Sequence, residues 1–163
     1  MSVEKIRYNR VGYVALNVTD IEKSVEFYVK MVGLKLDRPP ENGVAFLRCS
    51  DRHHDIMLVQ SSGEPGLKRI GMEMESLDAL AAVRAHFKDI GLPVVPVVPE
   101  ELQTLGIGEA FRSHEPVTKA VFEFYVDMKA APGAYRTTHT KIARLGHLVL
   151  NSSDRPATEK FLI

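Results

Sequence analysis

The chain has 163 residues, of which 45% are hydrophobic and 26% charged, which is typical of a soluble domain with a core of its own. Lys and Arg total 21, as do Asp and Glu, so no net charge favours nucleic acid or an anionic membrane as a partner. The apolar runs are far shorter than the roughly 20 residues that span a bilayer, the N-terminus has no apolar signal core, and a single cysteine, Cys49, excludes an internal disulfide and favours the cytoplasm.

The first part of the chain predicts a strand, a helix and three further strands. Residues 11–18 are mostly apolar and rich in β-branched and aromatic side chains, as expected of a strand. Thr19 and Glu22 have the spacing of a capping box, which predicts a helix that begins at Asp20. Gly33 is a typical residue to end it. Apolar stretches separated by turn-rich segments then predict strands over 34–39, 44–50 and 55–60.

The same order of elements returns over residues 67–128. A strand pattern over 67–75 precedes a helix that Ser76 should cap and Gly91 should end. Prolines 93, 96 and 99 then favour an edge strand or a polyproline segment, because proline cannot donate to a central ladder. Two more strand patterns follow, over 108–116 and 119–128.

Residues 10–61 and 67–128 are therefore predicted to be two βαβββ units, which gives an α+β fold. Each unit would leave an open sheet face that it cannot bury alone. We expect the two to pair in one domain, residues 1–128. Residues 129–143 are small and polar with little periodicity and are predicted to be a linker.

After the linker, the opening of the chain is repeated. Residues 144–151 read RLGHLVLN where residues 10–17 read RVGYVALN, and His147 falls at the position of Tyr13. We interpret residues 144–163 as the first strand and partial helix of a third unit, the truncated start of a second domain.

This repeated segment is also expected to influence assembly. Ser153 and Asp154 predict its helix start. Since 20 residues cannot complete a core, we expect the segment to be loosely held or docked on a neighbouring molecule. Its apolar strand, HLVL, would expose unpaired edges, which favours self-association.

These features resemble the vicinal oxygen chelate superfamily, which contains glyoxalase I, bleomycin-resistance binding proteins and type I extradiol ring-cleavage dioxygenases. The resemblance rests on the paired units, on the motif GLKLDRP after the first helix, and on the motif FEFYVD in the last strand. FLRCSDRHHDIMLVQ and ARLGHLVLN are most similar to the dioxygenase branch of the 2,3-dihydroxybiphenyl and catechol 2,3-dioxygenase type, whose members have two domains of two units each. The resemblance implies an open, cupped mixed sheet, and a non-catalytic first domain followed by the start of the catalytic one.

The resemblance also implies where the chemistry lies. In this family two His and one carboxylate hold a ferrous ion, which leaves positions open for a catecholate and O₂. His147 would be the first ligand, and the others are expected outside this sequence. In the first domain Tyr13 and either Gly71 or Met72 stand at the His positions, and only Glu123 matches, as a relic or structural group. The parent enzyme would act on a small aromatic diol, whereas this chain alone should bind no iron and be inactive.

Two other functions are compatible with the resemblance. A stand-alone binding protein of the bleomycin-resistance type would sequester a small molecule in a cup lined by aromatic residues such as Tyr13, Phe46, Phe122 and Phe124. A complete glyoxalase-type metal enzyme would need ligands from two chains, and the loss of His at positions 13 and 71 counts against it.

The remaining reactive side chains are assigned no function. His53 and His54 are interpreted as a polar hairpin turn, because adjacent strand residues point to opposite faces and seldom bind one metal together. Cys49 ends an apolar strand and is typical of a buried small residue. No spacing typical of a metal site connects the other histidines of this first domain and linker, which are His86, His114 and His139.

Overall fold

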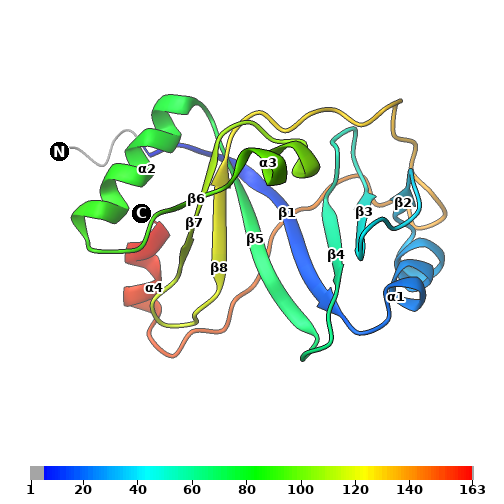
Figure 1. Cartoon of the computed structure of the whole chain (residues 1–163), viewed down its shortest axis with the longest axis horizontal. Coiled ribbons are helices and arrows are strands. Elements are labelled where there is room, and N and C mark those ends of the chain that lie inside the picture. Colours follow the sequence, from blue (N-terminus) through cyan, green and yellow to red (C-terminus); the bar gives the residue numbers. More distant parts are fainter. Residues whose placement is uncertain (1–5, 163) are drawn as a thin grey trace. The chain divides into compact units, whose positions relative to one another are not determined.

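The computed structural model of the chain describes residues 6–162, which form two compact lobes (Figure 1). The first lobe consists of residues 12–69 and 129–146. The second contains residues 6–11, 70–128 and 147–162. Each lobe holds most of one predicted βαβββ unit, and the segment predicted to be a linker belongs to the first lobe.

The first lobe is a four-stranded sheet covered on one face by a helix. Its strands follow the order β2-β3-β4-β1, with β1 parallel to β4 and the other pairs antiparallel. Ala45, Leu47 and Leu58 alternate along their strands and face the helix, where Ile21 completes a buried core. The elements are β1 (Tyr8–Val18), α1 (Ile21–Phe27), the π-helical η2 (Tyr28–Val32), β2 (Lys35–Leu36), β3 (Val44–Arg48) and β4 (Ile56–Gln60).

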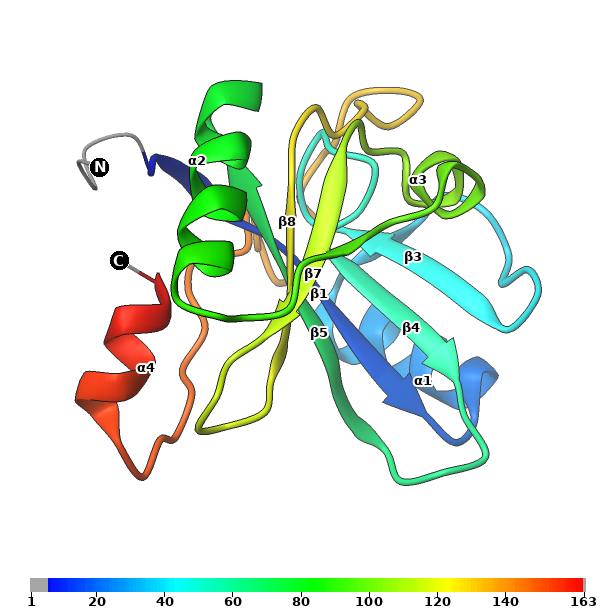
Figure 2. The ribbon, with the colours of Figure 1, turned by 60° about the vertical axis from the view of Figure 1, so that its left-hand side comes forward.

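The second lobe repeats this arrangement with the order β5-β8-β7-β6, and β5 is parallel to β8. Its core is a cluster of phenylalanines beneath two helices, which lie beside each other in Figures 1 and 2. The elements are β5 (Gly66–Met74), α2 (Leu77–Asp89), β6 (Val95–Pro96), α3 (Pro99–Leu105), β7 (Ala110–His114), β8 (Val121–Tyr125) and α4 (Arg155–Leu162). The predicted α+β class and the paired βαβββ units are confirmed.

The first helix begins one residue later than the sequence predicts. Asp20, and not Thr19, is the N-cap: its backbone is extended and its carboxylate accepts a hydrogen bond from the Lys23 amide at 3.0 Å. Asp is a stronger cap than Thr, which explains the shift. The hydrogen bond from Lys23 holds the pKa of Asp20 below its ordinary value. The predicted end at Gly33 is confirmed, with a left-handed φ of 81°.

Replacing Asp20 with Ala is expected to lower the free energy of unfolding by about 1 kcal/mol, because the first turn of α1 loses its cap. Replacing Thr19 with Ala is the matched control and should cost clearly less. Urea unfolding of both variants followed by circular dichroism measures the difference. An equal loss of stability in the two variants would contradict the assignment of Asp20 as the N-cap.

The helix α3 was not predicted, although its signals are present in the sequence. Pro99 occupies its first turn, Glu100 and Glu101 follow, and Gly106 ends it with a left-handed φ of 64°. The prolines before it predict an extended segment or edge strand, and β6 is a two-residue strand at the edge of the sheet. The helix matters because it carries Glu101 toward β7.

The segment after residue 143 differs from the prediction in part. No strand is formed over residues 144–151, which run extended, whereas α4 begins after Asp154 as predicted. Phe161 on α4 is only 1% exposed and packs into the core of the second lobe, so the helix is not loosely held. Among residues 6–162, no helix combines the length and apolar character needed to cross a bilayer.

Candidate functional site

Two of the positions singled out in the sequence lie side by side on the sheet of the second lobe. The register pairs Gly71 of β5 with Glu123 of β8, and Glu123 in turn with Arg112 of β7. Gly71, one of the two positions at which the resemblance implies a second His, therefore lies next to Glu123, which the resemblance places at the carboxylate position. Glu123 itself is completely buried.

Glu123 is engaged by a cation from its own sheet. Arg112 Nε donates to Glu123 Oε2 at 2.8 Å, and its two terminal nitrogens donate to the carboxylate oxygens of Glu101 on α3 at 3.1 and 2.6 Å. Burial alone would lower the pKa of Arg112, but the hydrogen bonds to Glu101 and the charge of Glu123 raise it overall. One guanidinium thus pairs with two carboxylates, and Glu123 has a structural partner in Arg112.

Tyr13 is likewise engaged within the first lobe. Its hydroxyl accepts a hydrogen bond from Arg69 Nε at 2.7 Å, and the Arg69 guanidinium carbon lies 5.8 Å from the centre of the Tyr13 ring. Both side chains are buried. Tyrosine therefore fills the position of the first His with a packed, hydrogen-bonded ring.

Residues 50–55 form the predicted turn between β3 and β4, but the expectation that it is polar on both histidines is wrong for His54. His54 is completely buried, with its ring centre 4.6 Å from that of Tyr13 and 4.8 Å from that of Phe46. The two Nδ1 atoms of the pair lie 2.9 Å apart. The opposite-face rule does not apply because residues 50–55 form a bend and not a regular strand. Burial, reinforced by the neighbouring His53 and Arg69, holds the pKa of His54 well below its ordinary value.

The aromatic residues proposed to line a cup are all buried. Phe122 and Phe124 belong to the core beneath α2 and α4. Phe46 makes an edge-to-face contact with the ring of His53. The guanidinium carbon of Arg38 lies 5.4 Å from the centre of the Phe46 ring. Phe122 and Phe124 therefore stabilise the core and do not form a ligand cup.

The described residues do not fit a ferrous ion. Within residues 6–162, no group of three His, Cys, Asp or Glu side chains is placed to hold a metal. His147 is exposed on its extended segment, and Cys49 is buried, where burial and then the charge of Asp55 raise the pKa of its thiol to about 12. Glu123 is taken by Arg112.

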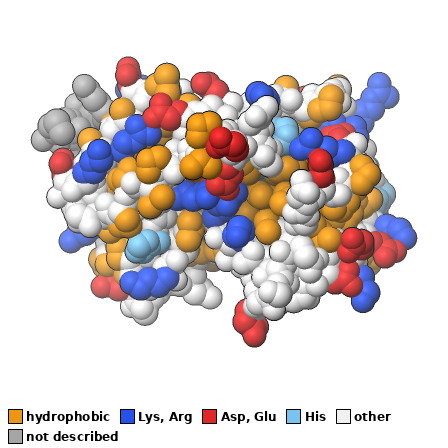
Figure 3. Space-filling view, in the orientation of Figure 1, with side chains coloured by type: hydrophobic (Ala, Val, Ile, Leu, Met, Phe, Trp, Pro, Cys, Tyr) orange, Lys and Arg blue, Asp and Glu red, His pale blue; other side chains and the backbone are white. Residues whose placement is uncertain are grey.

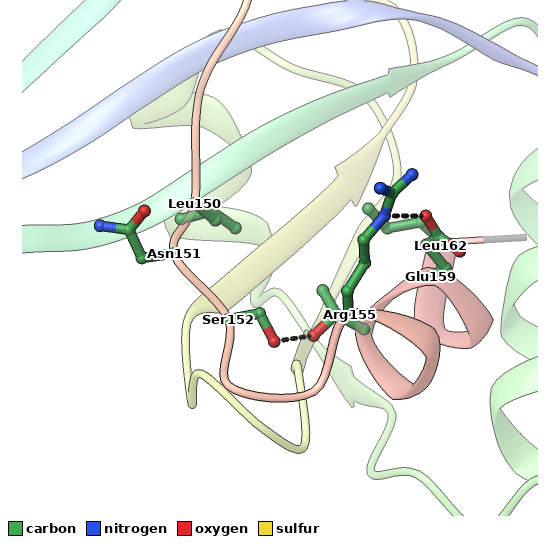
Figure 4. Close-up of a pocket in the computed structure, with 7 residues that line it drawn as sticks. Leu150, Asn151, Ser152, Arg155, Glu159 and Leu162 are labelled. Atoms are coloured by element: carbon green, nitrogen blue, oxygen red, sulfur yellow. Dashed lines mark hydrogen bonds and ion pairs between the residues drawn. The ribbon is translucent and has the colours of Figure 1, made fainter.

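A pocket of about 420 Å³ lies beside α4 (Figure 4). Its polar groups pair with one another: Arg155 Nε donates to Glu159 at 2.6 Å, and the hydroxyls of Ser152 and Thr158 are 2.7 Å apart. On the face of the molecule that Figure 3 shows, basic and acidic side chains are interspersed, and neither sign of charge dominates that face. The pocket is lined by Leu150, Asn151, Ser152, Arg155, Thr158, Glu159 and Leu162.

The family model described as the Glyoxalase/Bleomycin resistance protein/Dioxygenase superfamily matches residues 10–111. The chain belongs to this superfamily. The matched segment contains the whole first unit and the second as far as the start of β7, so membership rests on the same repeated elements that the structure shows.

Solved extradiol dioxygenases share the fold. A catechol 2,3-dioxygenase superposes with a TM-score of 0.78 at 18% identity, covering 96% of this chain and 57% of that one. BphC, a halotolerant catechol dioxygenase, gives 0.82 at 18%, covering 95% and 53%. Homoprotocatechuate 2,3-dioxygenase from Brevibacterium fuscum, with 3,4-dihydroxyphenylacetate bound, gives 0.78 at 22%, covering 96% and 49%. The chain spans about half the length of these proteins.

Proposed function

We propose that residues 10–128 are the non-catalytic first domain of a ferrous extradiol dioxygenase, and that His147 belongs to the catalytic domain of the same enzyme. The observation that carries the proposal is the ion pair between Arg112 and Glu123, with 2.7 Å between Arg112 Nη2 and Glu123 Oε2, because it removes the one carboxylate at a family ligand position. Superfamily membership and the fold shared with extradiol dioxygenases support it.

The proposed reaction of the whole enzyme is the opening of a catechol-type ring by O₂. A small aromatic diol is the proposed substrate, since the Brevibacterium fuscum relative was solved with 3,4-dihydroxyphenylacetate. Ferrous iron held by two His and one carboxylate supplies open positions for the diol and O₂. His147 is the one residue of this chain that we assign to these iron ligands, and its side chain is exposed.

The role proposed for the first domain is structural. Its two former ligand positions carry side chains that complete buried hydrogen bonds, Tyr13 with Arg69 and Glu123 with Arg112. We also propose self-association of the chain and a cytoplasmic setting, the latter supported by a single, buried cysteine.

Anaerobic loading of the chain with ferrous iron tests the proposal. After desalting, bound iron is counted, and 3,4-dihydroxyphenylacetate or catechol is added with O₂ while the coloured ring-opened product is followed. We expect less than a tenth of an iron per chain and no product, because the described residues bring no ligand set together. Light scattering of the same preparation reports self-association.

Each other outcome contradicts the proposal in a different way. Stoichiometric iron with product would show that chains assemble a complete site. Saturable binding of the diol without iron, measured by calorimetry, would favour a sequestering protein of the bleomycin-resistance type. A variant with His147→Ala is the control, since iron retained equally by this variant is not held at the proposed ligand.

A further inference from the structure

Residues 129–142, most of the segment 129–143 that is predicted to be a linker, are fastened to the first lobe at one end by the bend at residues 50–55. The His53 amide donates to the Lys129 carbonyl at 2.9 Å, and the Ala131 amide donates to the Asp51 carbonyl at 2.8 Å. The Asp51 carboxylate accepts a further hydrogen bond from the amide of Tyr135. We call residues 129–142 the strap.

The middle of the strap is held by Arg48, which is 1% exposed. Its Nη2 donates to the Gly133 carbonyl at 3.3 Å, and its guanidinium carbon lies 5.8 Å from the centre of the Tyr135 ring. The same guanidinium also pairs with Asp37, the residue that follows β2, and this pair helps to fix its position. The Tyr135 hydroxyl donates to the Ile142 carbonyl at 2.9 Å, which turns the strap back on itself.

The far end of the strap closes over the end of η2. Thr138 Oγ1 donates to the Gly33 carbonyl at 2.6 Å, and Thr140 Oγ1 donates to the Val32 carbonyl at 2.9 Å. A Cβ at Gly33 would collide with both threonine hydroxyls, so glycine is needed here for the approach of the strap as well as for its positive φ. The strap is therefore an ordered part of the first lobe.

The bend that holds the strap contains the His53–His54 pair. His54 is completely buried, and its Nε2 has no hydrogen-bond partner. An unpaired acceptor is less costly there than an unpaired N–H, so His54 carries its proton on Nδ1 and donates to Nδ1 of His53. This hydrogen bond requires that His53 Nδ1 be unprotonated.

Most of the charged groups that act on the pair are positive. Arg38, from the turn after β2, and Lys129, from the strap itself, oppose a charge on His53, while Asp37 favours it. Arg69, from β5, and Arg52, within the bend, oppose a charge on His54. The other neighbours that contact the His54 ring, from β1 and β3, are the uncharged rings of Tyr13 and Phe46.

We propose that the strap stays on the first lobe while His53 and His54 are neutral, and that it detaches when the pair takes up a proton in mildly acidic solution. A charge on His54 must reach water, which requires the bend to open, and the amide of His53 and the carbonyl of Asp51 then lose Lys129 and Ala131. A charge on His53 also repels Lys129 directly.

The direction of the pH effect follows from proton linkage. In the docked strap the pKa of both rings lies below 6.5, mainly because burial disfavours the charge, whereas an exposed histidine takes up a proton near pH 6.5. Below about pH 6.5 the detached form binds more protons, so docking is fully favourable above this pH and weakens as the pH falls. One proton changes the equilibrium about tenfold per pH unit.

Hydrogen exchange of the whole chain, read by mass spectrometry at pH 7.5, 6.5 and 5.5, tests the proposal. After correction for intrinsic exchange rates, strap peptides should lose about tenfold protection between pH 6.5 and 5.5, while α2 peptides should not. The variant His54→Phe keeps a ring of similar size and should reduce the pH dependence to the part that His53 contributes. The variant His139→Gln removes an exposed histidine of the strap and should leave it unchanged.

NMR titration of the histidine ring protons in the unmodified chain keeps the test independent of how the variants fold. The proposal is overturned if His54 titrates at an ordinary pH, or if its protonation leaves the strap protected. It is also overturned if His139→Gln removes the effect. None of these readouts depends on iron or on a diol, so they are separate from the test of the proposed function.

Discussion

Replacing Arg112 with methionine is expected to lower the free energy of unfolding by about 3–5 kcal/mol, since it takes from the buried carboxylate of Glu123 the cation that Arg112 supplies. Glu123 is 0% exposed, and Arg112 Nε lies 2.8 Å from it. Methionine keeps the aliphatic length of the side chain and removes only the charge and the donors. Urea unfolding measured at pH 7 by circular dichroism and fluorescence gives the loss.

Two further variants separate a buried charge from lost packing. Replacing Glu123 with Gln in the Arg112→Met background should recover much of the stability, because a neutral amide is less costly to bury than a carboxylate. Replacing Arg7 with Met removes a surface pair with Glu75, at 3.8 Å, and should cost less than about 1 kcal/mol. If Arg112→Met and Arg7→Met cost the same, Glu123 is not held as the structure indicates.

The ion pair of Arg112 and Glu123 could not be predicted from the sequence, because it joins two neighbouring strands. The resemblance to the family implies that Glu123 stands at a ligand position, and that inference needs only the FEFYVD motif in the sequence. Its pairing with Arg112 depends on the register of β7 against β8, and the link to Glu101 depends on a helix that was missed. Contacts between elements are set by register and packing, which a single sequence specifies only weakly.

The alternation of apolar residues predicted the strands, and Ser76 and Gly33 predicted helix boundaries that are confirmed. The His53–His54 pair shows the limit of such rules. Successive side chains point to opposite faces only within a regular strand. The rings of His53 and His54 lie against each other because the bend brings two successive side chains to one side. The strap illustrates a related limit: its small and polar residues predict a linker, but they form hydrogen bonds with partners far away in the sequence.

Replacing Phe161 with Ala is expected to cost about 3–5 kcal/mol, the usual loss for a phenylalanine truncated in a packed core. Its ring centre lies 4.8 Å from that of Phe87, with which it stacks, and 5.1 Å from that of Phe122. The side chain is 1% exposed. Denaturant unfolding measures the global loss, and hydrogen exchange of α4 peptides shows whether the helix alone detaches.

The control for Phe161 is Val149→Ala, which truncates a side chain that is 78% exposed on the preceding extended segment and should change stability by less than about 0.5 kcal/mol. A loss below about 1 kcal/mol for Phe161→Ala, with no change in α4 exchange, would contradict docking of the helix. The comparison with Phe27, its counterpart in the repeat, is informative because Phe27 is 53% exposed. Equivalent positions in two copies thus have different environments, so the repeat predicts that a helix forms but not the surface that it covers. Because α4 docks through Phe161, the segment that carries His147 is anchored at its C-terminal end to the core of the second lobe.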